Sequence, residues 1–318
     1  MRAFVLFFIV LCLTGCAPTQ ADFSAPPALQ PTPVLPSKLS RSASGQPELQ
    51  VYIKAEDRLR ALPIENYVAC VLAGEMANDW PLEALKAQAV LARTFVMKFV
   101  SEKESRYEGA DISSDITEAQ AYDEAGVNDR ILRAVQETQG QVLAVGDQFP
   151  YAWFHAHSGG VTAFAQEGLD YQKEEPVYTQ VTPGRESAAA PEEAQVWEAS
   201  FTANAFLSAC KDVGVPLDEL YSLSIHETGP SGRAVTLLVN DTPVPAAPLR
   251  LALGSTVMRS TLLTDLHLAN GRVVMAGKGY GHGVGMSQWG AYALAEAGHT
   301  YDDIILSYCD NVRLVTLW

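Results

Sequence analysis

The most restrictive feature of the sequence is a segment in which glycines almost alternate with functional side chains, Gly277 to Gly290 (GKGYGHGVGMSQWG). Because each glycine adds backbone freedom and removes a side chain, this segment is not an ordinary helix or strand. It predicts a backbone that comes close to another group, and His282 in its glycine frame is a candidate site residue. The alternative is a tightly packed turn. A phosphate-binding loop is excluded, because the order G-x-x-x-x-G-K-[ST] is absent.

Length and composition allow a large core and argue against a nucleic-acid partner. The chain has 318 residues, of which 48% are hydrophobic, enough for one large domain or two lobes. Its formal net charge of -15 repels phosphate backbones. Beyond Cys16 the cysteines are far apart, which supports neither a disulfide framework nor a zinc knuckle. Of these, Cys70 lies in an apolar stretch and is predicted to be a buried thiol.

The N-terminal residues have the three-part form of an export signal. Arg2 supplies a positive charge, and Ala3 to Leu13 is an apolar run too short to span a bilayer. Thr14-Gly15 then precede Cys16, an order that resembles a bacterial lipoprotein signal. We expect residues 1–15 to be a signal peptide and Cys16 to be lipidated, so that the protein is exported and lipid-anchored to a bacterial membrane, facing the cell wall or periplasm. An ordinary cleaved signal and an uncleaved anchor are the alternatives.

The rest of the chain divides into a tether and a folded part. Residues 16–47 are rich in proline and small polar residues, which predicts an extended tether. The folded part is predicted over residues 48–318, with a surface loop from Gly184 to Glu193. Periodicity and capping residues predict helices over Ile64–Met76 and Pro81–Ser101, one helix capped by Ser287 that stops at Gly298, and one that begins at Thr300. Strands are predicted at Gln50–Lys54, Gln141–Val145, Tyr151–His155 (joined to the previous strand through Gly146-Asp147), Val235–Val239 and Arg272–Ala276.

This mixture of elements predicts an α+β fold rather than a regular parallel sheet. We expect mixed helices and mostly antiparallel strands, arranged as two lobes that flank a substrate cleft.

One carboxylate continues the apolar face of the first predicted helix. Glu75 follows Val68 and Leu72 on the same stripe, where it is expected to face protein. Burial raises the pKa of a carboxyl group, and a carboxyl kept protonated near neutral pH is what a general acid needs. Gly74 beside it leaves room for a ligand to approach. The alternatives are a structural glutamate bonded to a neighbour and a helix end that turns to solvent.

Other polar residues in unusual positions are weaker candidates. Gln88 lies on the apolar stripe of the second predicted helix and needs partners in the protein or in a substrate. Lys86 and Arg93 share another face, where they either meet a substrate carboxylate or are solvated. His155 and His157 point the same way at a strand end, but without an identifiable third metal ligand a hydrogen-bonding role is favoured.

Several segments together resemble a known family. Tyr67 to Thr94 (YVACVLAGEMANDWPLEALKAQAVLART) and Gly279 to Gly290 closely resemble the signature of the stage II sporulation protein D and amidase-enhancer family. Weaker family blocks follow in the right order at Asp115–Tyr122, His155–Gly160 and Pro176–Val181. The resemblance extends roughly from Glu48 to Arg313.

The resemblance implies a lytic transglycosylase that acts on peptidoglycan, preferably on glycan without stem peptides. The catalytic glutamate of the family lies in an E-M pair, which here is Glu75-Met76. One carboxyl group would protonate the glycosidic oxygen between N-acetylmuramic acid and N-acetylglucosamine. The same group would then take the proton of the muramic acid 6-hydroxyl, which closes onto C1 and leaves a 1,6-anhydro end. Because water is not the nucleophile, a second carboxylate is not required.

The same family blocks give the expected substrate-binding residues, among which Lys86 or Arg93 would bind the lactyl carboxylate of muramic acid. The full set is Lys86, Gln88, Arg93, Gln120, Tyr122, His155, Ser158, Gly159, His282, Gly283, Ser287 and Gln288. The expected partners are peptidoglycan glycan strands, a membrane through the lipid anchor and a cell-wall amidase, with no nucleic acid.

One departure from the family bears on cofactors and alternatives. Some relatives bind zinc with cysteines near the block at Asp115–Tyr122, but no cysteine lies there in this sequence. We therefore expect no cofactor and no metal ligand, with zinc kept as an alternative. The competing functions are a non-catalytic protein that binds stem-peptide-free glycan and recruits or stimulates an amidase, and a metal-dependent hydrolase.

Overall fold

A computed structural model describes residues 30–43 and 45–318, and residues 32–318 form one compact unit. The predicted signal peptide and the predicted lipidation site Cys16 lie outside the described residues. The unit combines helices with mostly antiparallel sheets, so the α+β prediction is confirmed. In the described part of the chain, no helix is both long and apolar enough to cross a membrane.

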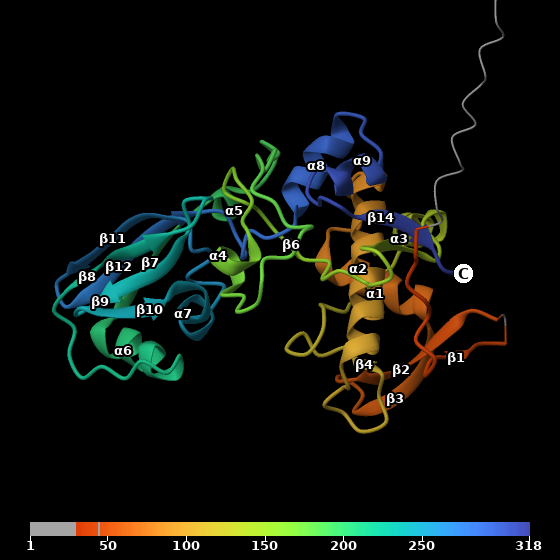
Figure 1. Ribbon diagram of the computed structural model, residues 1–318, viewed down its shortest axis with the longest axis horizontal. Helices are drawn as coiled ribbons and strands as arrows, with labels where there is room; N and C mark the ends of the chain where they lie inside the picture. Colours follow the sequence, from red (N-terminus) through yellow and green to blue (C-terminus); the bar gives the residue numbers. More distant parts are fainter. Residues whose placement is uncertain (1–29, 44) are drawn as a thin grey trace, which may run out of the picture. The chain divides into compact units, whose positions relative to one another are not determined.

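The larger hydrophobic core is built around the helices α1 and α2, which pack on each other, with α3, α8 and α9 packed on α2 (Figure 1). A sheet of β1, β2 and β3, extended by β4, and the antiparallel pair of β5 and β14 complete it. These elements are β1 (Ser40–Arg41), β2 (Pro47–Ile53), β3 (Arg58–Pro63), α1 (Ile64–Glu75), α2 (Leu82–Glu102), β4 (Ile112–Ser113), α3 (Asp129–Glu137), β5 (Gln141–Ala144), α8 (Gln288–Glu296), α9 (Tyr301–Leu306) and β14 (Arg313–Thr316).

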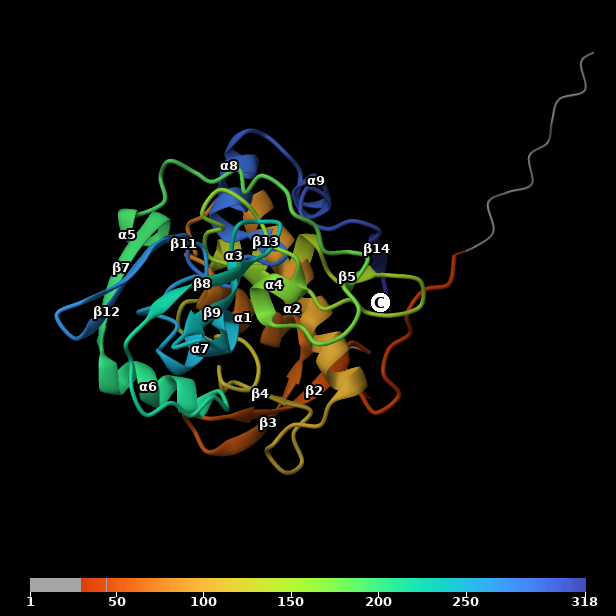
Figure 2. The same cartoon turned by 60° about the vertical axis from the view of Figure 1, so that its left-hand side comes forward.

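A second, separate core lies between two three-stranded sheets and two helices. The sheets have the strand orders β10-β9-β8 and β11-β12-β7, both antiparallel, and these elements stay grouped in the two views of Figures 1 and 2. They are β7 (Val196–Thr202), α6 (Ala203–Asp212), β8 (Leu223–Thr228), β9 (Ala234–Val239), β10 (Thr242–Pro245), α7 (Ala246–Ala252), β11 (Leu263–Ala269) and β12 (Arg272–Lys278). Two cores agree with the two lobes expected from the sequence, while a cleft between them stays a prediction.

Two segments that resemble the family, His155–Gly160 and Gly279–Gly290, contact each other in the region between the two cores. β6 (Phe154–His155) pairs in parallel with β13 (Met286–Ser287), and His157 bridges to Tyr280. A small third cluster of Ala163, Ala165 and Val284 adds apolar contact there. The short helices α4 (Ala165–Leu169) and α5 (Glu192–Gln195) flank this region.

Two local predictions differ from the structure. The strand predicted over Tyr151–His155 is limited to Phe154–His155, and the two strands joined through Gly146-Asp147 have other partners: β5 pairs with β14, and β6 pairs with β13. A turn does form at Val145 and Gln148, but each strand has a partner far along the chain, which local sequence does not encode. Ser40–Arg41 and Pro47 of the expected tether belong to the folded unit, because β1 pairs with the start of β2.

Candidate active site

The candidate acid lies at the C-terminal end of α1. Val68, Val71 and Leu72 of this helix are fully buried, as the apolar stripe predicts. The helix ends at Glu75 because Met76 is extended, and the Met76 N–H closes the last turn on the carbonyl of Leu72. Glu75 therefore projects from the edge of the main core and is half-buried.

The two oxygens of the Glu75 carboxyl group have different surroundings. Oε1 accepts a hydrogen bond from the backbone N–H of Ala121 at 2.7 Å. Oε2 has no hydrogen-bond partner in the described residues and is not among the buried polar atoms, so it reaches solvent. Burial raises the pKa of Glu75, and the Ala121 N–H opposes this only in part. A proton bound to this carboxyl group therefore sits on the open oxygen Oε2, because Oε1 accepts the Ala121 N–H.

The sequence suggested that Gly74 leaves room for a ligand. In the structure the space beside Gly74 is filled by another segment of the chain. A Cβ at Gly74 would lie 2.8 Å from the backbone of Ala121 and Tyr122. Only glycine lets the segment before Asp123 cross the end of α1 this closely, and the Asp123 N–H also bonds to the carbonyl of Cys70. The close approach is what brings the Ala121 N–H onto Glu75.

The predicted site residues Gln120 and Tyr122 flank Ala121 and so belong to this site. Gln120 is only 4% exposed, and neither of its amide atoms has a partner within residues 30–43 and 45–318. Tyr122 lies with its ring 5.7 Å from that of Tyr67, and burial raises its pKa. Buried amides normally have partners, and the amide of Gln120 has none among the described residues although its atoms are enclosed by protein, so its role in substrate binding stays a prediction.

The glycine-rich segment supplies the other side of the site. Ser287 caps α8 by accepting the Gly290 N–H, as predicted, and this fixes the next residue, Gln288. The Gln288 side chain donates from Nε2 to the backbone carbonyl of Glu75 at 3.1 Å. Its Oε1 makes no hydrogen bond in the described residues and remains an acceptor beside the acid.

A second carboxylate, which the sequence placed in a surface loop, lies behind Ser287. Glu186 accepts from the Ser158 N–H at 2.8 Å, from the Ser158 hydroxyl in a short hydrogen bond, and from the Ser287 hydroxyl at 2.9 Å. Its side chain is 11% exposed, and His157 Nε2 lies 3.7 Å away. The loop from Gly184 to Glu193 is thus anchored inward at Glu186. No local sequence signal marked this residue, because its partners are distant in sequence.

His155 and His282 are neutral histidines with fixed tautomers. His155 donates from Nδ1 to the carbonyl of Val284 at 3.1 Å, which leaves Nε2 as a buried acceptor without a partner among the described residues. The Val284 N–H donates to His282 Nδ1 at 3.0 Å. Burial lowers the pKa of His155 well below its usual value and that of His282 to about 3. Neither ring therefore serves as a proton donor near neutral pH.

The glycines predicted to bind substrate, Gly159 and Gly283, are packing positions in the fold, and substrate binding by their backbone stays a prediction. A Cβ at Gly283 would overlap the guanidinium group of Arg233, and one at Gly159 would meet the backbone of Lys278. Both glycines have positive φ. Arg233 is fully buried and donates to the carbonyls of Ser158 and Val161. The alternative of a tightly packed turn thus holds for these glycines, since the segment approaches its own chain.

Three predicted substrate residues of α2 are corrected. Arg93 is fully buried and contacts Glu65 at 2.6 Å and the carbonyl of Gln141 at 3.0 Å, so no substrate carboxylate reaches it. Lys86 is paired with Glu83 at 2.7 Å and with a second acid, Glu137. Gln88 is fully buried in the main core without a described partner. Helix periodicity shows which residues share a face, but it does not show whether that face contacts protein or a ligand.

The described residues do not fit a zinc ion at the family block. Asp115 is 3% exposed, and its oxygens are already bonded by Lys54, Tyr107 and Thr117. Among residues 30–43 and 45–318, no group of three His, Cys, Asp or Glu side chains is placed to hold a metal. The cysteines Cys70, Cys210 and Cys309 are free and buried.

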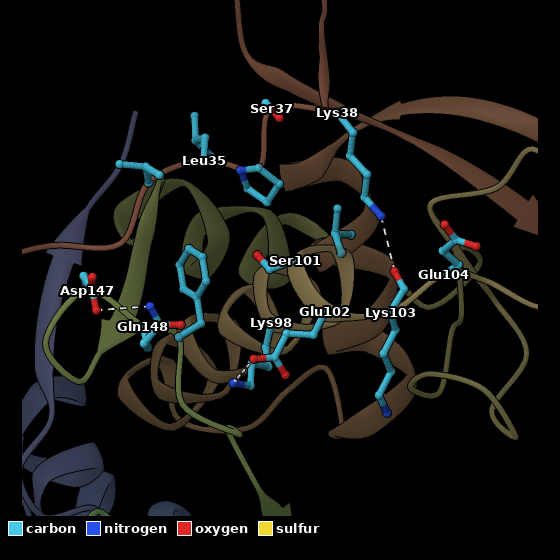
Figure 3. Close-up of a pocket in the computed structure, with 14 residues that line it drawn as sticks. Leu35, Ser37, Lys38, Lys98, Ser101, Glu102, Lys103, Glu104, Asp147 and Gln148 are labelled. Carbon is cyan, nitrogen blue, oxygen red and sulfur yellow. Dashed lines mark hydrogen bonds and ion pairs between the residues drawn. The ribbon is translucent and has the colours of Figure 1, made fainter.

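A cavity of about 800 Å³ lies away from Glu75, between segment 34–38, the end of α2 and the turn at residues 147–149 (Figure 3). Lys38 donates to the carbonyl of Lys103 at 3.3 Å there, and the Lys98–Glu102 pair lies below. Glu75 is not among the residues that line this cavity, so the cavity adds nothing to the candidate acid.

Comparison with known proteins gives the family. Residues 52–144 match the model of the stage II sporulation protein family, a range that includes Glu75 and Ala121. An uncharacterized protein of Brachyspira hyodysenteriae is 31% identical over 255 residues, 80% of this chain and 67% of that protein. Stage II sporulation protein D of Bacillus subtilis is 28% identical over 284 residues, 84% of this chain and 78% of that protein. The amidase enhancer of Bacillus subtilis is 28% identical over 290 residues, 77% of this chain but 40% of that longer protein. The chain therefore belongs to the stage II sporulation protein D family.

Proposed function

We propose that this protein is a peptidoglycan lytic transglycosylase in which Glu75 is the single acid and base. The observation that carries the proposal is the asymmetry of the Glu75 carboxyl group: one oxygen is held by the Ala121 N–H, and the other is open. Its raised pKa favours the protonated form that a general acid requires. Membership of the stage II sporulation protein D family supports a role at the cell wall.

In the proposed reaction, Oε2 of Glu75 donates its proton to the oxygen that joins N-acetylmuramic acid to N-acetylglucosamine. The bond from C1 of muramic acid to that oxygen breaks, and the freed sugar leaves with the proton. The 6-hydroxyl of the same muramic acid attacks C1, and its proton passes to the carboxylate of Glu75. The product carries a 1,6-anhydro end, and the acid is restored. No further carboxylate takes part, which agrees with Glu186 being occupied by three hydrogen bonds.

Gln288 is the residue that we expect to meet the substrate beside Glu75. Its free Oε1 suits the hydroxyl and acetamido groups of a hexosamine. The substrate is proposed to be glycan without stem peptides, and the reaction is proposed to need no metal. Export and a lipid anchor at Cys16 stay part of the proposal.

Product analysis tests this function. Stem-peptide-free glycan strands are digested with the protein and with Glu75→Gln, and the masses of the products are read. Anhydro-ended fragments are expected from the parent protein and none from Glu75→Gln. Glu124→Gln is the matched control, because this exposed glutamate of the same region pairs with Arg60 and not with the site. Reducing-end products would overturn the transglycosylase in favour of hydrolysis.

The similarity to a protein named amidase enhancer supports a second candidate, a glycan-binding protein that recruits or stimulates a cell-wall amidase. This candidate needs no proton transfer by Glu75. It would replace the first if neither the parent protein nor Glu75→Gln produced fragments while both bound glycan.

A further inference from the structure

Three aromatic side chains meet at the turn that follows Glu75. Trp80 and Trp289 have ring centroids 4.5 Å apart and tilted by 52°, and Tyr292 lies edge-on to Trp80 at 5.2 Å. Trp289 and Tyr292 lie one turn apart on α8 with centroids 5.3 Å apart. All three rings are partly exposed. We call this group the aromatic platform.

Two connections place the aromatic platform next to the candidate acid. Trp80 closes the turn between α1 and α2, where its N–H bonds to the carbonyl of Ala77, two residues after Glu75. Trp289 directly follows Gln288, whose side chain bonds to the Glu75 carbonyl. The Trp289 N–H also donates to the carbonyl of Ala156 at 3.1 Å, so this part of α8 is fixed.

The polar atoms of the aromatic platform are unused by the protein. The indole nitrogens of Trp80 and Trp289 and the hydroxyl of Tyr292 make no hydrogen bond in the described residues. None of these three atoms is among the buried unpartnered atoms, so each is open to solvent. Buried packing aromatics usually pair these groups with protein, whereas ligand-binding ones offer an apolar face with a free donor.

The chemistry that matches such a surface is a pyranose ring. A β-linked hexosamine carries its substituents around its edge, so its flat faces present C–H groups. These groups are weakly positive and apolar, and they fit the negative face of an aromatic ring, while the hydroxyls at the edge can accept an indole N–H. We propose that the aromatic platform of Trp80, Trp289 and Tyr292 binds a hexosamine ring of the glycan strand next to the bond cleaved at Glu75. This inference rests on the proposed function for the identity of the glycan.

A second aromatic group in the chain provides the contrast. Tyr151 and Trp153 stack at 5.1 Å, but here the Tyr151 hydroxyl donates to Glu102, and Lys98 lies over its ring. Tyr178 is likewise used, because its hydroxyl accepts the Tyr151 N–H. Trp153 is thus a partly exposed tryptophan in a cluster whose tyrosine hydroxyls are used by the protein, and Trp153→Phe is a control for the loss of a tryptophan outside the platform.

Binding measured without turnover tests the platform. In the Glu75→Gln background, stem-peptide-free glycan strands and N-acetylchitohexaose are titrated by calorimetry and by tryptophan emission. Trp289→Ala is expected to weaken binding at least tenfold, and Trp80→Phe and Trp289→Phe are each expected to reduce the emission change on binding. Trp153→Phe should keep both the affinity for glycan and the emission change on binding. The Phe variants keep a ring in the core and therefore give a result even where Trp289→Ala fails to fold.

Unchanged affinity in folded Trp289→Ala, or a full emission change in the double variant Trp80→Phe, Trp289→Phe, would overturn the platform. Failure of the proposed function gives a different result, because the parent protein would then make no anhydro-ended fragments while the platform variants still lost glycan affinity. If the parent protein made anhydro-ended fragments and every platform variant bound glycan as the parent does, the platform proposal would be rejected. The proposed transglycosylase function would then still stand.

Discussion

The backbone N–H of Ala121 lies 2.7 Å from Oε1 of Glu75, and this contact makes the two oxygens of one carboxyl group unequal. An acceptor bond to Oε1 leaves the proton on Oε2, the oxygen that reaches solvent. The contact exists because Gly74 lets the segment with Ala121 cross the end of α1. The expected consequences can be measured at each of these residues.

The pH dependence of stability should show the raised pKa of Glu75. A carboxyl whose pKa is higher in the folded than in the unfolded state ionises first in the unfolded chain, so it lowers stability as pH rises above its unfolded pKa, about 4.3. Glu75→Gln removes this effect. The Tm of Glu75→Gln minus that of the parent should be near its minimum at about pH 4 and increase toward neutral pH. A difference that shrinks with rising pH would contradict the raised pKa.

The reaction rate should also depend on the ionisation of Glu75. The reaction starts from protonated Glu75, so the rate of fragment formation should fall as pH rises through its pKa. The measurement is the rate at saturating glycan from acid to mildly basic pH. Glu124→Gln should keep the profile of the parent, and a profile that rises with pH would show that the acid is another group.

Gly74→Ala should separate the acid from the N–H that orients it. The new Cβ would lie 2.8 Å from the backbone of Ala121 and Tyr122, so the segment must move. We expect a loss of about 1–3 kcal/mol in the free energy of unfolding and a rate at least about tenfold lower. Urea denaturation and the pH–rate profile measure the two effects.

Gly168→Ala is the control, since its Cβ would also meet backbone, at His282, but away from Glu75. It should destabilise the protein while the pH–rate profile stays unchanged. A Gly74→Ala variant with the parent profile would show that the crossing segment does not govern the acid.

Arg93→Lys should affect folding and not substrate binding. Arg93 is fully buried against Glu65, and lysine cannot reproduce its several hydrogen bonds. We expect a loss of about 3 kcal/mol in the free energy of unfolding, with glycan affinity unchanged where the variant is folded. If Arg93 instead bound the lactyl carboxylate, affinity would fall for native glycan but not for carboxyl-reduced glycan.

Glu186→Gln should disturb the segment that carries Gln288. Glu186 accepts from both polar groups of Ser158 through one oxygen and from Ser287 through the other, and an amide nitrogen cannot accept. We expect a loss of about 1.5–3 kcal/mol in the free energy of unfolding and a slower reaction, although Glu75 is intact. Chemical denaturation and fragment assays test this. The exposed Glu192→Gln in the same segment should change neither.

Features encoded over a few residues were predictable. The ends of α1 and α2 agree with the predictions to within two residues, because a stripe of apolar side chains and the helix-starting Pro81 act within one or two turns. Ser287 caps α8, and Thr300 bonds to Asp303 at the start of α9, as their short spacing predicts. The position of Glu75 at the edge of the apolar stripe also followed from helix periodicity alone.

Features that depend on contacts between residues distant in sequence were not predictable. The strand predicted over Tyr151–His155 is limited to Phe154–His155, and β5 and β6 each pair with a strand near the C-terminus, which local sequence does not encode. Glu186 was assigned to a surface loop, and Arg93 to a ligand-binding face, since burial by another segment leaves no local signal. Gly74 was read as space for a ligand, whereas the space is filled by the chain.

The sequence by itself determined the helices α1, α2, α8 and α9, the Ser287 cap, the family and the identity of the candidate acid, because periodicity, capping and motifs act through neighbouring residues. Only the tertiary structure decided what surrounds that acid. The Ala121 N–H reaches Glu75 across 46 residues, and Gln288 reaches it across 213. Such contacts depend on how elements pack, so the raised pKa, the open oxygen and the neighbouring tryptophans become visible only in the folded chain.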